Sequence, residues 1–387
     1  MTLTAATHQT EVQAQVHPVL SAVRIGPLSL ANRVAVAPMS RVSTSGDGVP
    51  TAEMSAYYER FAAGGFGLLI TEGTYTDHAF SQAYPNQPAI VTAEQVDSWR
   101  AVTDAVHAAG GRIVLQLMHA GALSQHNHHR DSTIGPSSVR PLREKMAPYG
   151  GTGPFAVPVA ATQGDIDEAV GGFATSAVLA REAGFDGVEV HGANGYLIDQ
   201  FLTTYTNLRT DSYGGDVHGR VRLATQVLLA IRAEVGPDYP VGIRLSQTKV
   251  NDLDYRWPGG HGEAEVIFRA VADAGASYLH LASEGRDWLE TATLDSGETV
   301  TRLARTVTGL PVIANGGMHD VERAASVLRD GHADLIALAR GALTHADWPR
   351  RVASGTAVEA FDRTVFGAGV TLTDQAEWEA GRAGDRS

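Results

Sequence analysis

Three polar side chains, those of Gln116, His191 and Arg244, stand at similar points of three predicted β-strands. Each lies in a segment whose alternate residues are aliphatic, the segments being 113–117, 188–191 and 241–245. Side chains alternate between the two faces of a strand, so the three polar groups share the face opposite the aliphatic ones. Any one of them alone is compatible with an ordinary hydrogen-bonded residue. Three in phase on successive strands favour a binding or catalytic site.

Segment 191–196, with the sequence His-Gly-Ala-Asn-Gly-Tyr, adds groups suited to acid catalysis. His191 and Asn194 can both donate hydrogen bonds to one substrate oxygen and so polarise a carbonyl or nitro group. Tyr196 carries a phenol with an ordinary pKa of about 10, which can donate a proton to carbon. The alternative interpretation is a glycine-rich turn with a packing tyrosine.

Two glycine-containing segments near the C-terminus have the composition of a phosphate site. Gly316 and Gly317 follow one apolar segment, and Ala339 and Arg340 follow the next. Bare backbone N–H groups bind anions, and an arginine adds a bidentate charge.

The first two predicted strands end in a hydroxyl and in a glycine, and both ends are also compatible with ordinary loops. Ala37, Pro38, Met39 and Ser40 close the first strand with a hydroxyl at its rim. Gly73 closes the second, where the missing side chain lets a ring approach the backbone.

The elements that must position these residues repeat along the chain. A helical stretch, a glycine turn and a short apolar strand recur in seven segments: 61–71, 105–117, 180–191, 230–245, 270–281, 306–315 and 327–340. With an opening strand at 33–38, they make eight strands alternating with helices, which predicts an α/β fold of the (β/α)₈ TIM-barrel type. The longest loops follow strands, at 119–166, 192–218, 246–261 and 283–298, as at the catalytic face of such barrels.

We therefore expect a polar N-terminal extension (1–17), a single barrel (18–360) and a C-terminal tail (361–387). The tail has weak periodicity and is compatible with an arm over the barrel or with disorder. The N-terminus lacks the features of a secretory signal, and no apolar run is long enough to span a membrane, so we expect a cytoplasmic location.

The composition excludes several classes of function. The net charge of −13 argues against a nucleic-acid partner, which requires a basic face. The chain has no cysteine, which excludes disulfides, thiolate zinc sites and cysteine-ligated iron–sulfur clusters. Redox chemistry would then depend on an organic cofactor or on a metal with nitrogen and oxygen ligands, and we predict no metal site. The sequence does not distinguish a monomer from a homo-oligomer.

These segments together resemble the Old Yellow Enzyme family of FMN-dependent oxidoreductases. The resemblance runs from about residue 19 to 350 and includes NRVAVAPMSR (32–41), LLITEGT (68–74), VLQLMHAGAL (114–123), IGPSSV (134–139), AGFDGVEVHGANGYLIDQFL (183–202), NLRTDSYGG (207–215), GIRLS (242–246), ANGGM (314–318) and ADLIALARGAL (333–343). Segment 183–215 is highly specific. The chain departs from the family at Ser40, where threonine or cysteine is more usual, and at Val42, two positions later, where one branch has a tyrosine. It also departs in loop 246–261 and in the tail.

The resemblance implies a role for each candidate residue. Those that would contact FMN are Ala37, Pro38, Met39, Ser40, Gly73, Gln116, Arg244, Gly316, Gly317, Ala339 and Arg340. Among them, Arg244 would face the N1/O2 edge of the flavin, and Gly317, Ala339 and Arg340 would hold its phosphate. His191 and Asn194 would bind the electron-withdrawing group of an activated alkene, and Tyr196 would protonate it.

The implied function is an ene-reductase that uses NADPH or NADH in a ping-pong reaction. Two alternatives remain open at this stage. One is an oxidative or non-ene flavin protein on the same barrel. The other is a non-redox barrel enzyme that binds a sugar phosphate, for which Glu189 is the one deep carboxylate on the inward strand positions.

Overall fold

Short apolar segments that follow glycine turns form the strands of the barrel. The computed structural model describes residues 16–283, 288–367 and 369–384. Within these residues, eight parallel strands pair in a closed ring, each with its neighbours and the last with the first. They are β3 (Val34–Val36), β4 (Leu68–Ile70), β6 (Ile113–Met118), β9 (Gly187–Asn194), β10 (Val241–Lys249), β11 (Tyr278–Ala282), β12 (Val312–Asn315) and β13 (Leu335–Leu338). The predicted (β/α)₈ barrel is confirmed.

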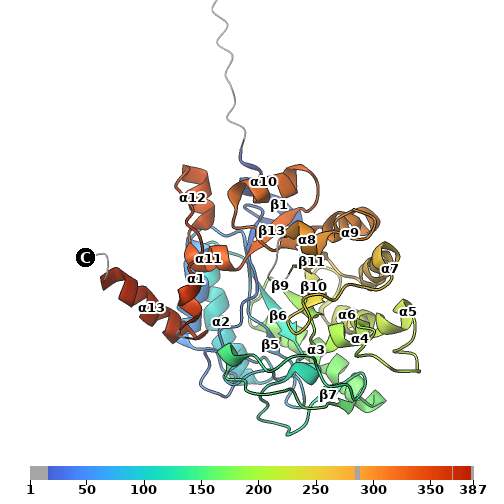
Figure 1. The fold of residues 1–387 in the computed structure, drawn as a ribbon. Helices are drawn as coiled ribbons and strands as arrows, with labels where there is room; N and C mark the ends of the chain where they lie inside the picture. The colour runs from blue at the N-terminus through green and yellow to red at the C-terminus, as the bar shows by residue number, and fades with distance from the viewer. Residues whose placement is uncertain (1–15, 284–287, 368, 385–387) are drawn as a thin grey trace, which may run out of the picture.

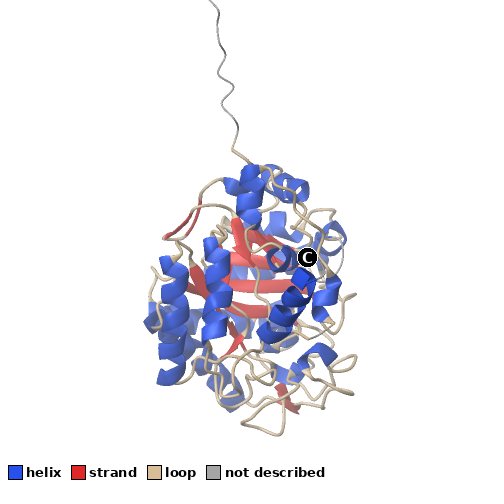
Figure 2. Cartoon of the chain, turned by 90° about the vertical axis from the view of Figure 1, so that its left-hand side faces the viewer, coloured by secondary structure: helices blue, strands red, loops and turns tan. Residues whose placement is uncertain are grey.

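Helices surround the strands, as the two views in Figures 1 and 2 show. They are α1 (Ala52–Ala63), α2 (Ala93–Ala108), α3 (Gln163–Glu182), α4 (Leu197–Leu202), α5 (Val217–Arg220), α6 (Arg222–Val235), α7 (Gly260–Asp273), α8 (Trp288–Ala292), α9 (Val300–Thr308), α10 (Val321–Arg329), α11 (Arg340–Thr344), α12 (Trp348–Ser354) and α13 (Leu372–Gly384). Side-chain caps fix several starts. Thr92 and Thr162, for example, begin α2 and α3 with complete capping boxes. None of the helices in the described ranges is both long and apolar enough for a membrane crossing.

Short elements complete the described chain. A hairpin of β1 (Val23–Ile25) and β2 (Leu28–Leu30) precedes the barrel, β5 (Thr74–Tyr75) extends the edge of β6, and β7 (Ile134–Gly135) pairs with β8 (Val159–Ala160). Single 3₁₀ turns are η1 (Pro18–Leu20), η2 (Gly121–Leu123), η3 (Ala147–Tyr149) and η4 (Arg363–Phe366). The predicted N-terminal extension, apart from residues 16 and 17, lies outside the described residues. Residues 284–287 of the loop predicted at 283–298 also lie outside them.

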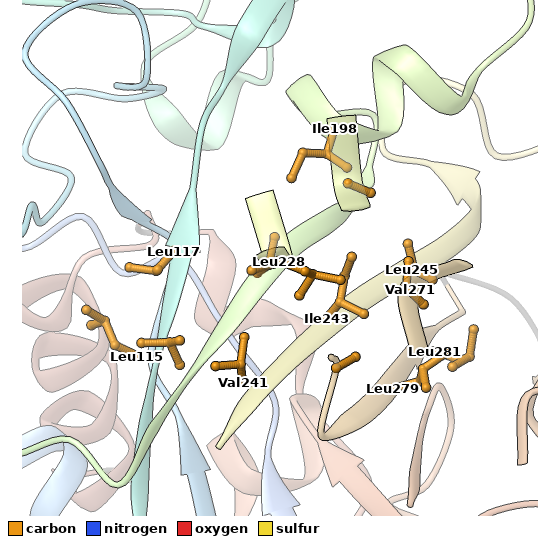
Figure 3. Close-up of a cluster of buried hydrophobic side chains, with 14 of the residues drawn as sticks. Leu115, Leu117, Ile198, Leu228, Val241, Ile243, Leu245, Val271, Leu279 and Leu281 are labelled. Atoms are coloured by element: carbon orange, nitrogen blue, oxygen red, sulfur yellow. The ribbon is translucent and has the colours of Figure 1, made fainter. Parts of the chain in front are cut away.

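The strand register places the polar and the aliphatic side chains on opposite faces of the strands, as the sequence pattern predicts. Gln116 pairs with Glu189, and His191 with Arg244, across adjacent strands. The aliphatic phase, including Leu115 and Ile243, packs against the surrounding helices (Figure 3). Each fully buried aliphatic side chain of this layer contributes about 1.5–3 kcal/mol to stability. A separate apolar cluster fills the barrel interior, with Val114, Tyr278, Ile313 and Leu335 among its members.

Two strands are longer than the sequence pattern indicates, and both carry site residues. β9 continues to Asn194, so part of the glycine-rich segment is still strand, and β10 continues to Lys249. The pairing of the two strands is interrupted after Leu245 and resumes where Lys249 meets Asn194. The bulge between these points lies in the loop that departs from the family pattern.

The C-terminal tail is an arm that lies against the barrel near α1. Helix α13, red in Figure 1, is joined to α1 by an ion pair of Arg60 with Glu379 at 3.6 Å. Just before this helix, the carbonyl of Thr371 accepts a hydrogen bond from Arg41 at 3.0 Å. The tail thus reaches the segment that follows the first barrel strand.

Candidate active site

Two adjoining cavities lie at the C-terminal ends of the barrel strands. The central cavity has a volume of about 340 Å³ and the outer cavity about 540 Å³. Both are lined by Asn315, Ala339 and Arg340, which form their common border. Each volume lies in the range of sites for small molecules and cofactors.

The structure brings all fourteen candidate residues to these two cavities. The central cavity is lined by Ala37, Pro38, Met39, Ser40, Gly73, Gln116, His191, Asn194, Tyr196, Arg244, Ala339 and Arg340. The outer cavity is lined by Gly316, Gly317, Ala339 and Arg340. The placement agrees with a site at the strand ends, and the role of each residue remains a prediction.

A buried hydrogen-bonded cluster supports the floor of the central cavity. The carboxylate of Glu189 accepts hydrogen bonds from Gln116 at 2.8 Å and from Tyr278 at 3.2 Å, and it contacts the His280 ring at 3.0 Å. Burial alone would raise the pKa of Glu189, but His280, Arg244 and Gln116 outweigh it and hold the pKa below its ordinary value. Glu189 does not line either cavity. It therefore anchors Gln116 instead of facing a ligand.

Arg244 reaches the central cavity with its guanidinium held between two amide groups. It donates to Oδ1 of Asn194 at 3.1 Å and to Oδ1 of Asn315 at 3.0 Å. These bonds give the two terminal nitrogens of the buried arginine an acceptor each, and both acceptors are neutral. The positive charge is thus not cancelled by these two partners, and it can act on a ligand in the cavity. Asn315 was identified from the sequence only as the residue before the two glycines.

His191 is held as a neutral imidazole. Burial, reinforced by the charges of Arg244 and His280, lowers its pKa well below the ordinary value. Its Nδ1 accepts a long hydrogen bond of 3.4 Å from the backbone N–H of Ala193. A neutral ring with Nδ1 as acceptor carries its proton on Nε2. His191 is therefore a hydrogen-bond donor through Nε2.

Tyr196 is part of a group of three tyrosines, of which Tyr196 and Tyr84 are buried and Tyr149 is partly buried. Its hydroxyl lies 2.5 Å from that of Tyr84, a short hydrogen bond, and its ring is 4.9 Å from His191. Tyr84 stacks on Tyr149 with ring centroids 4.4 Å apart. Burial, with contributions from Tyr196 and Tyr149, raises the pKa of Tyr84 well above its ordinary value. Tyr84 therefore keeps its proton and can donate it in a hydrogen bond to Tyr196.

A second buried carboxylate, that of Glu72, holds the backbone next to residues that line the central cavity. Its Oε2 accepts hydrogen bonds from the backbone N–H groups of Arg41 at 2.8 Å and Val42 at 2.9 Å. Val42 has a φ of +42°, a conformation that a β-branched residue rarely adopts. Burial raises the pKa of Glu72 to about 7, despite these two hydrogen bonds and the nearby Arg41 charge.

The outer cavity is suited to an anion. Gly316 and Gly317 have φ angles of +127° and +65°, so their peptide groups turn in a way that residues with a side chain rarely allow. Arg340 lines this cavity, and Arg363 and Phe361 reach it from the tail. Two arginines and exposed backbone groups favour a phosphate.

Several site residues were missed by the sequence reasoning. Tyr84, Tyr149 and Val370 come from loops and from the tail, which have no periodic pattern that would assign them to a site. Glu72 was visible only as the neighbour of Gly73. The signal that identifies these residues is spatial and depends on contacts between distant segments.

Comparisons with known proteins agree with this geometry. Residues 19–359 match the model of the NADH:flavin oxidoreductase / NADH oxidase family. A putative 12-oxophytodienoate reductase 2 from Oryza sativa subsp. japonica is 33% identical over 354 residues, which cover 90% of each protein. The solved structure of an old yellow enzyme homologue from Zymomonas mobilis has a TM-score of 0.80 and 30% identity, and covers 88% of this chain and 94% of its own. The structure of morphinone reductase in complex with tetrahydroNAD gives a TM-score of 0.78 and 32% identity, covering 89% and 93%.

The two cavities fit the cofactor that this family implies. The central cavity has a volume of about 340 Å³ and is lined by Pro38, by Gly73, which has no side chain, and by the charged Arg244. The outer cavity offers cations and glycine backbone for a phosphate. The chain belongs to the NADH:flavin oxidoreductase / NADH oxidase family, that of the Old Yellow Enzymes, and is an FMN-dependent oxidoreductase that uses NAD(P)H.

Proposed function

We propose that this protein is an ene-reductase, which reduces C=C bonds conjugated to a carbonyl or nitro group in a ping-pong reaction. The observation that carries the proposal is the convergence of His191, Asn194 and Tyr196 on the cavity that the flavin-facing candidates also line. Two hydrogen-bond donors and a phenol in one cavity are the groups needed to polarise and protonate an activated alkene. FMN, when bound, supplies the hydride that it has received from NADH or NADPH.

The electron-withdrawing oxygen of the substrate would bind to His191 and Asn194. The neutral His191 donates through Nε2. Asn194 gives its Oδ1 to Arg244, and the other polar atom of this side chain, Nδ2, is a donor. Two donors on one oxygen stabilise the negative charge that develops there when hydride adds to the β-carbon.

Tyr196 would complete the reduction by giving its phenolic proton to the α-carbon. Hydride and proton together saturate the double bond, and the tyrosine is left as a phenolate. The Tyr84 hydroxyl, 2.5 Å away, can donate a hydrogen bond to this phenolate. A donor bond to the charged form favours ionisation and so makes Tyr196 a stronger acid.

Arg244 and Arg340 would serve the cofactor. We infer that Arg244, with its two amide partners, faces the electron-rich edge of the flavin ring, where a cation stabilises the reduced anionic form. Arg340 lies on the border of both cavities and suits the phosphate.

The non-redox alternative has less support. It requires a carboxylate pair or a lysine facing the cavity, and neither cavity is lined by Glu189 or Lys249. Glu189 is committed to Gln116, Tyr278 and His280, and Lys249 to Asp199.

The test begins with the visible spectrum of the purified protein. NADPH or NADH is then added without oxygen, followed by cyclohexenone or a nitroalkene. We expect flavin absorption, bleaching by the nicotinamide and recovery on addition of the alkene. Bleaching without recovery would leave a flavin oxidoreductase but reject the ene-reductase.

A further inference from the structure

We propose that the buried ion pair of Asp199 with Lys249 is a positioning unit that holds residues 194–196 in the conformation that points Asn194 and Tyr196 into the central cavity. Neither Asp199 nor Lys249 lines that cavity, so both act on it through residues 194–196. The inference rests on the proposed function of Tyr196 for its kinetic consequences, and its structural part is independent of it.

The turn needs support because its backbone is unusual. Asn194 has a φ of +65° and Gly195 a φ of +88°, two consecutive residues in a region that side chains disfavour. Asparagine tolerates this region better than most residues, but two such residues in a row are held only by their surroundings. The turn also separates His191 in the strand from Tyr196 at the start of α4. Its geometry therefore decides where the phenol lies.

Contacts from two elements hold the peptide groups of the turn. The N–H of Asn194 donates to Ser246 Oγ at 2.9 Å, and its carbonyl accepts from the N–H of Val250 at 3.2 Å. The N–H of Gly195 donates to Asp199 Oδ2 at 2.7 Å, and its carbonyl accepts from Gln200 Nε2 at 2.8 Å. Asp199 and Gln200 belong to α4, whereas Ser246 belongs to β10 and Val250 directly follows it.

The ion pair of Asp199 with Lys249 joins α4 to β10 on the two sides of the turn. Nζ of Lys249 lies 2.5 Å from Oδ1 of Asp199, and the two side chains are 1% and 0% exposed. The same Nζ is 3.4 Å from the Ser246 carbonyl and 4.7 Å from the centroid of the Tyr255 ring. The two carboxylate oxygens of Asp199 thus have different partners: Oδ1 bonds to the Lys249 ammonium group, and Oδ2 accepts a hydrogen bond from the Gly195 N–H.

The charge balance explains why a lysine is needed there. Burial raises the pKa of Asp199 and lowers that of Lys249, and the opposite charge of each partner works against these changes. Without the cation of Lys249, the ionised carboxylate would carry a large desolvation penalty. Lys249 lies in the loop where the chain departs from its family, so the sequence did not identify it.

The first test removes the acceptor of Gly195. Asp199→Leu has nearly the same shape but no oxygen. We expect the alkene half-reaction to slow at least tenfold more than flavin reduction, because Tyr196 loses its position while the cofactor cavity is kept. In hydrogen–deuterium exchange, the peptide that contains Gly195 should exchange faster. Unchanged exchange and an unchanged ratio of the two rate constants would overturn the proposal.

The second test assigns the two oxygens. In Asp199→Asn, the single amide oxygen is contested by Lys249 and Gly195, so we expect the alkene half-reaction to slow. Adding Lys249→Met removes the competitor, and the amide oxygen can then accept from Gly195. The double variant should recover most of the lost rate. A double variant no faster than D199N would contradict the divided role, whatever its melting temperature.

A matched control is another buried ion pair among the described residues, Arg220 with Glu263, whose side chains are 8% and 6% exposed. It makes none of the contacts described above with residues 194–196. Arg220→Met should lower the melting temperature as the other variants do, without changing exchange at Gly195 or the ratio of half-reactions. If R220M and D199L behave alike, the pair has only a structural role. If the wild type turns over no alkene, the proposed function fails, and the exchange measurement still tests the positioning role.

Discussion

Two turns that line the central cavity are each held by a buried carboxylate, but the two carboxylates differ in their charged partners. In the first turn, residues 38–42, the carboxylate of Glu72 accepts hydrogen bonds from the N–H groups of Arg41 and Val42, and Val42 has a φ of +42°. In the second, residues 194–196, the carboxylate of Asp199 accepts the N–H of Gly195, at φ +88°. Both carboxylates are buried, and both stabilise backbone that would otherwise be strained.

The difference lies in the partner of the second oxygen. Asp199 gives its other oxygen to Lys249, whereas Oε1 of Glu72 has no hydrogen-bond partner in the described structure. Arg41 lies close enough to lower the pKa of Glu72, but one N–H of its guanidinium goes to the Thr371 carbonyl. The second turn is therefore held by a paired charge. The first is held by a group that titrates near neutral pH.

The largest expected effect separates the turns by their chemistry. Tyr196→Phe removes the proposed acid at the end of the second turn and leaves the first turn intact. General acid catalysis contributes about 10²–10⁴-fold, so the alkene half-reaction should slow by that factor. Flavin reduction by NADPH should change little. Stopped-flow absorbance measures both steps, and equal slowing of the two would contradict the proton-donor role.

Glu72 makes stability depend on pH through the first turn. Its folded pKa is about 7, above the ordinary value of 4.5. The native state therefore binds more protons between these values, and stability is full below about pH 4.5 and lost as pH rises through 7. At about 1.4 kcal/mol per unit, the loss is about 3 kcal/mol. Glu72→Gln should abolish it, which urea unfolding at several pH values measures.

Glu53→Gln is the control for this experiment. Glu53 is exposed in the first turn of α1, and the substitution makes the same change of charge. Its stability curve should run parallel to that of the wild type across the pH range. A parallel curve for E72Q as well would mean that Glu72 does not titrate as the structure indicates.

Tyr84 acts on the second turn from outside it, and its removal should have a smaller effect than that of Tyr196. Tyr84→Phe keeps the ring that stacks on Tyr149 but removes the hydroxyl that bonds to Tyr196. A lost hydrogen bond of about 1.4 kcal/mol slows the proton step about tenfold. Tyr213→Phe is the control, because this buried hydroxyl bonds to Gln226 away from the cavity. The alkene half-reaction of Y213F should match that of the wild type.

The sequence predicted the barrel and the cavity residues for a physical reason. Glycine turns and alternating aliphatic residues are local signals, and in-phase positions on parallel strands must meet at one end of a barrel. The pairs that hold the two turns have no such signal. Asp199 and Lys249 are 50 residues apart, and Tyr84 and Tyr196 are 112 apart. Their partners follow from the packing of loops, which no periodicity encodes.

The smallest expected effect concerns the cofactor side of the comparison. Ser40 lies in the first turn and lines the central cavity, and we predict that its hydroxyl donates to the flavin edge. Such a bond favours the reduced form by about 1 kcal/mol, so Ser40→Ala should lower the two-electron potential by about 20 mV. Reduction by NADH then slows slightly, and hydride donation to the alkene becomes slightly faster. Changes in the second turn affect only the alkene step, whereas this change moves the two half-reactions in opposite directions.

Ser40→Thr keeps a hydroxyl and should keep the potential within a few mV. Titration against a reference dye measures it, and equal potentials for S40A and S40T would show that the hydroxyl does not reach the flavin.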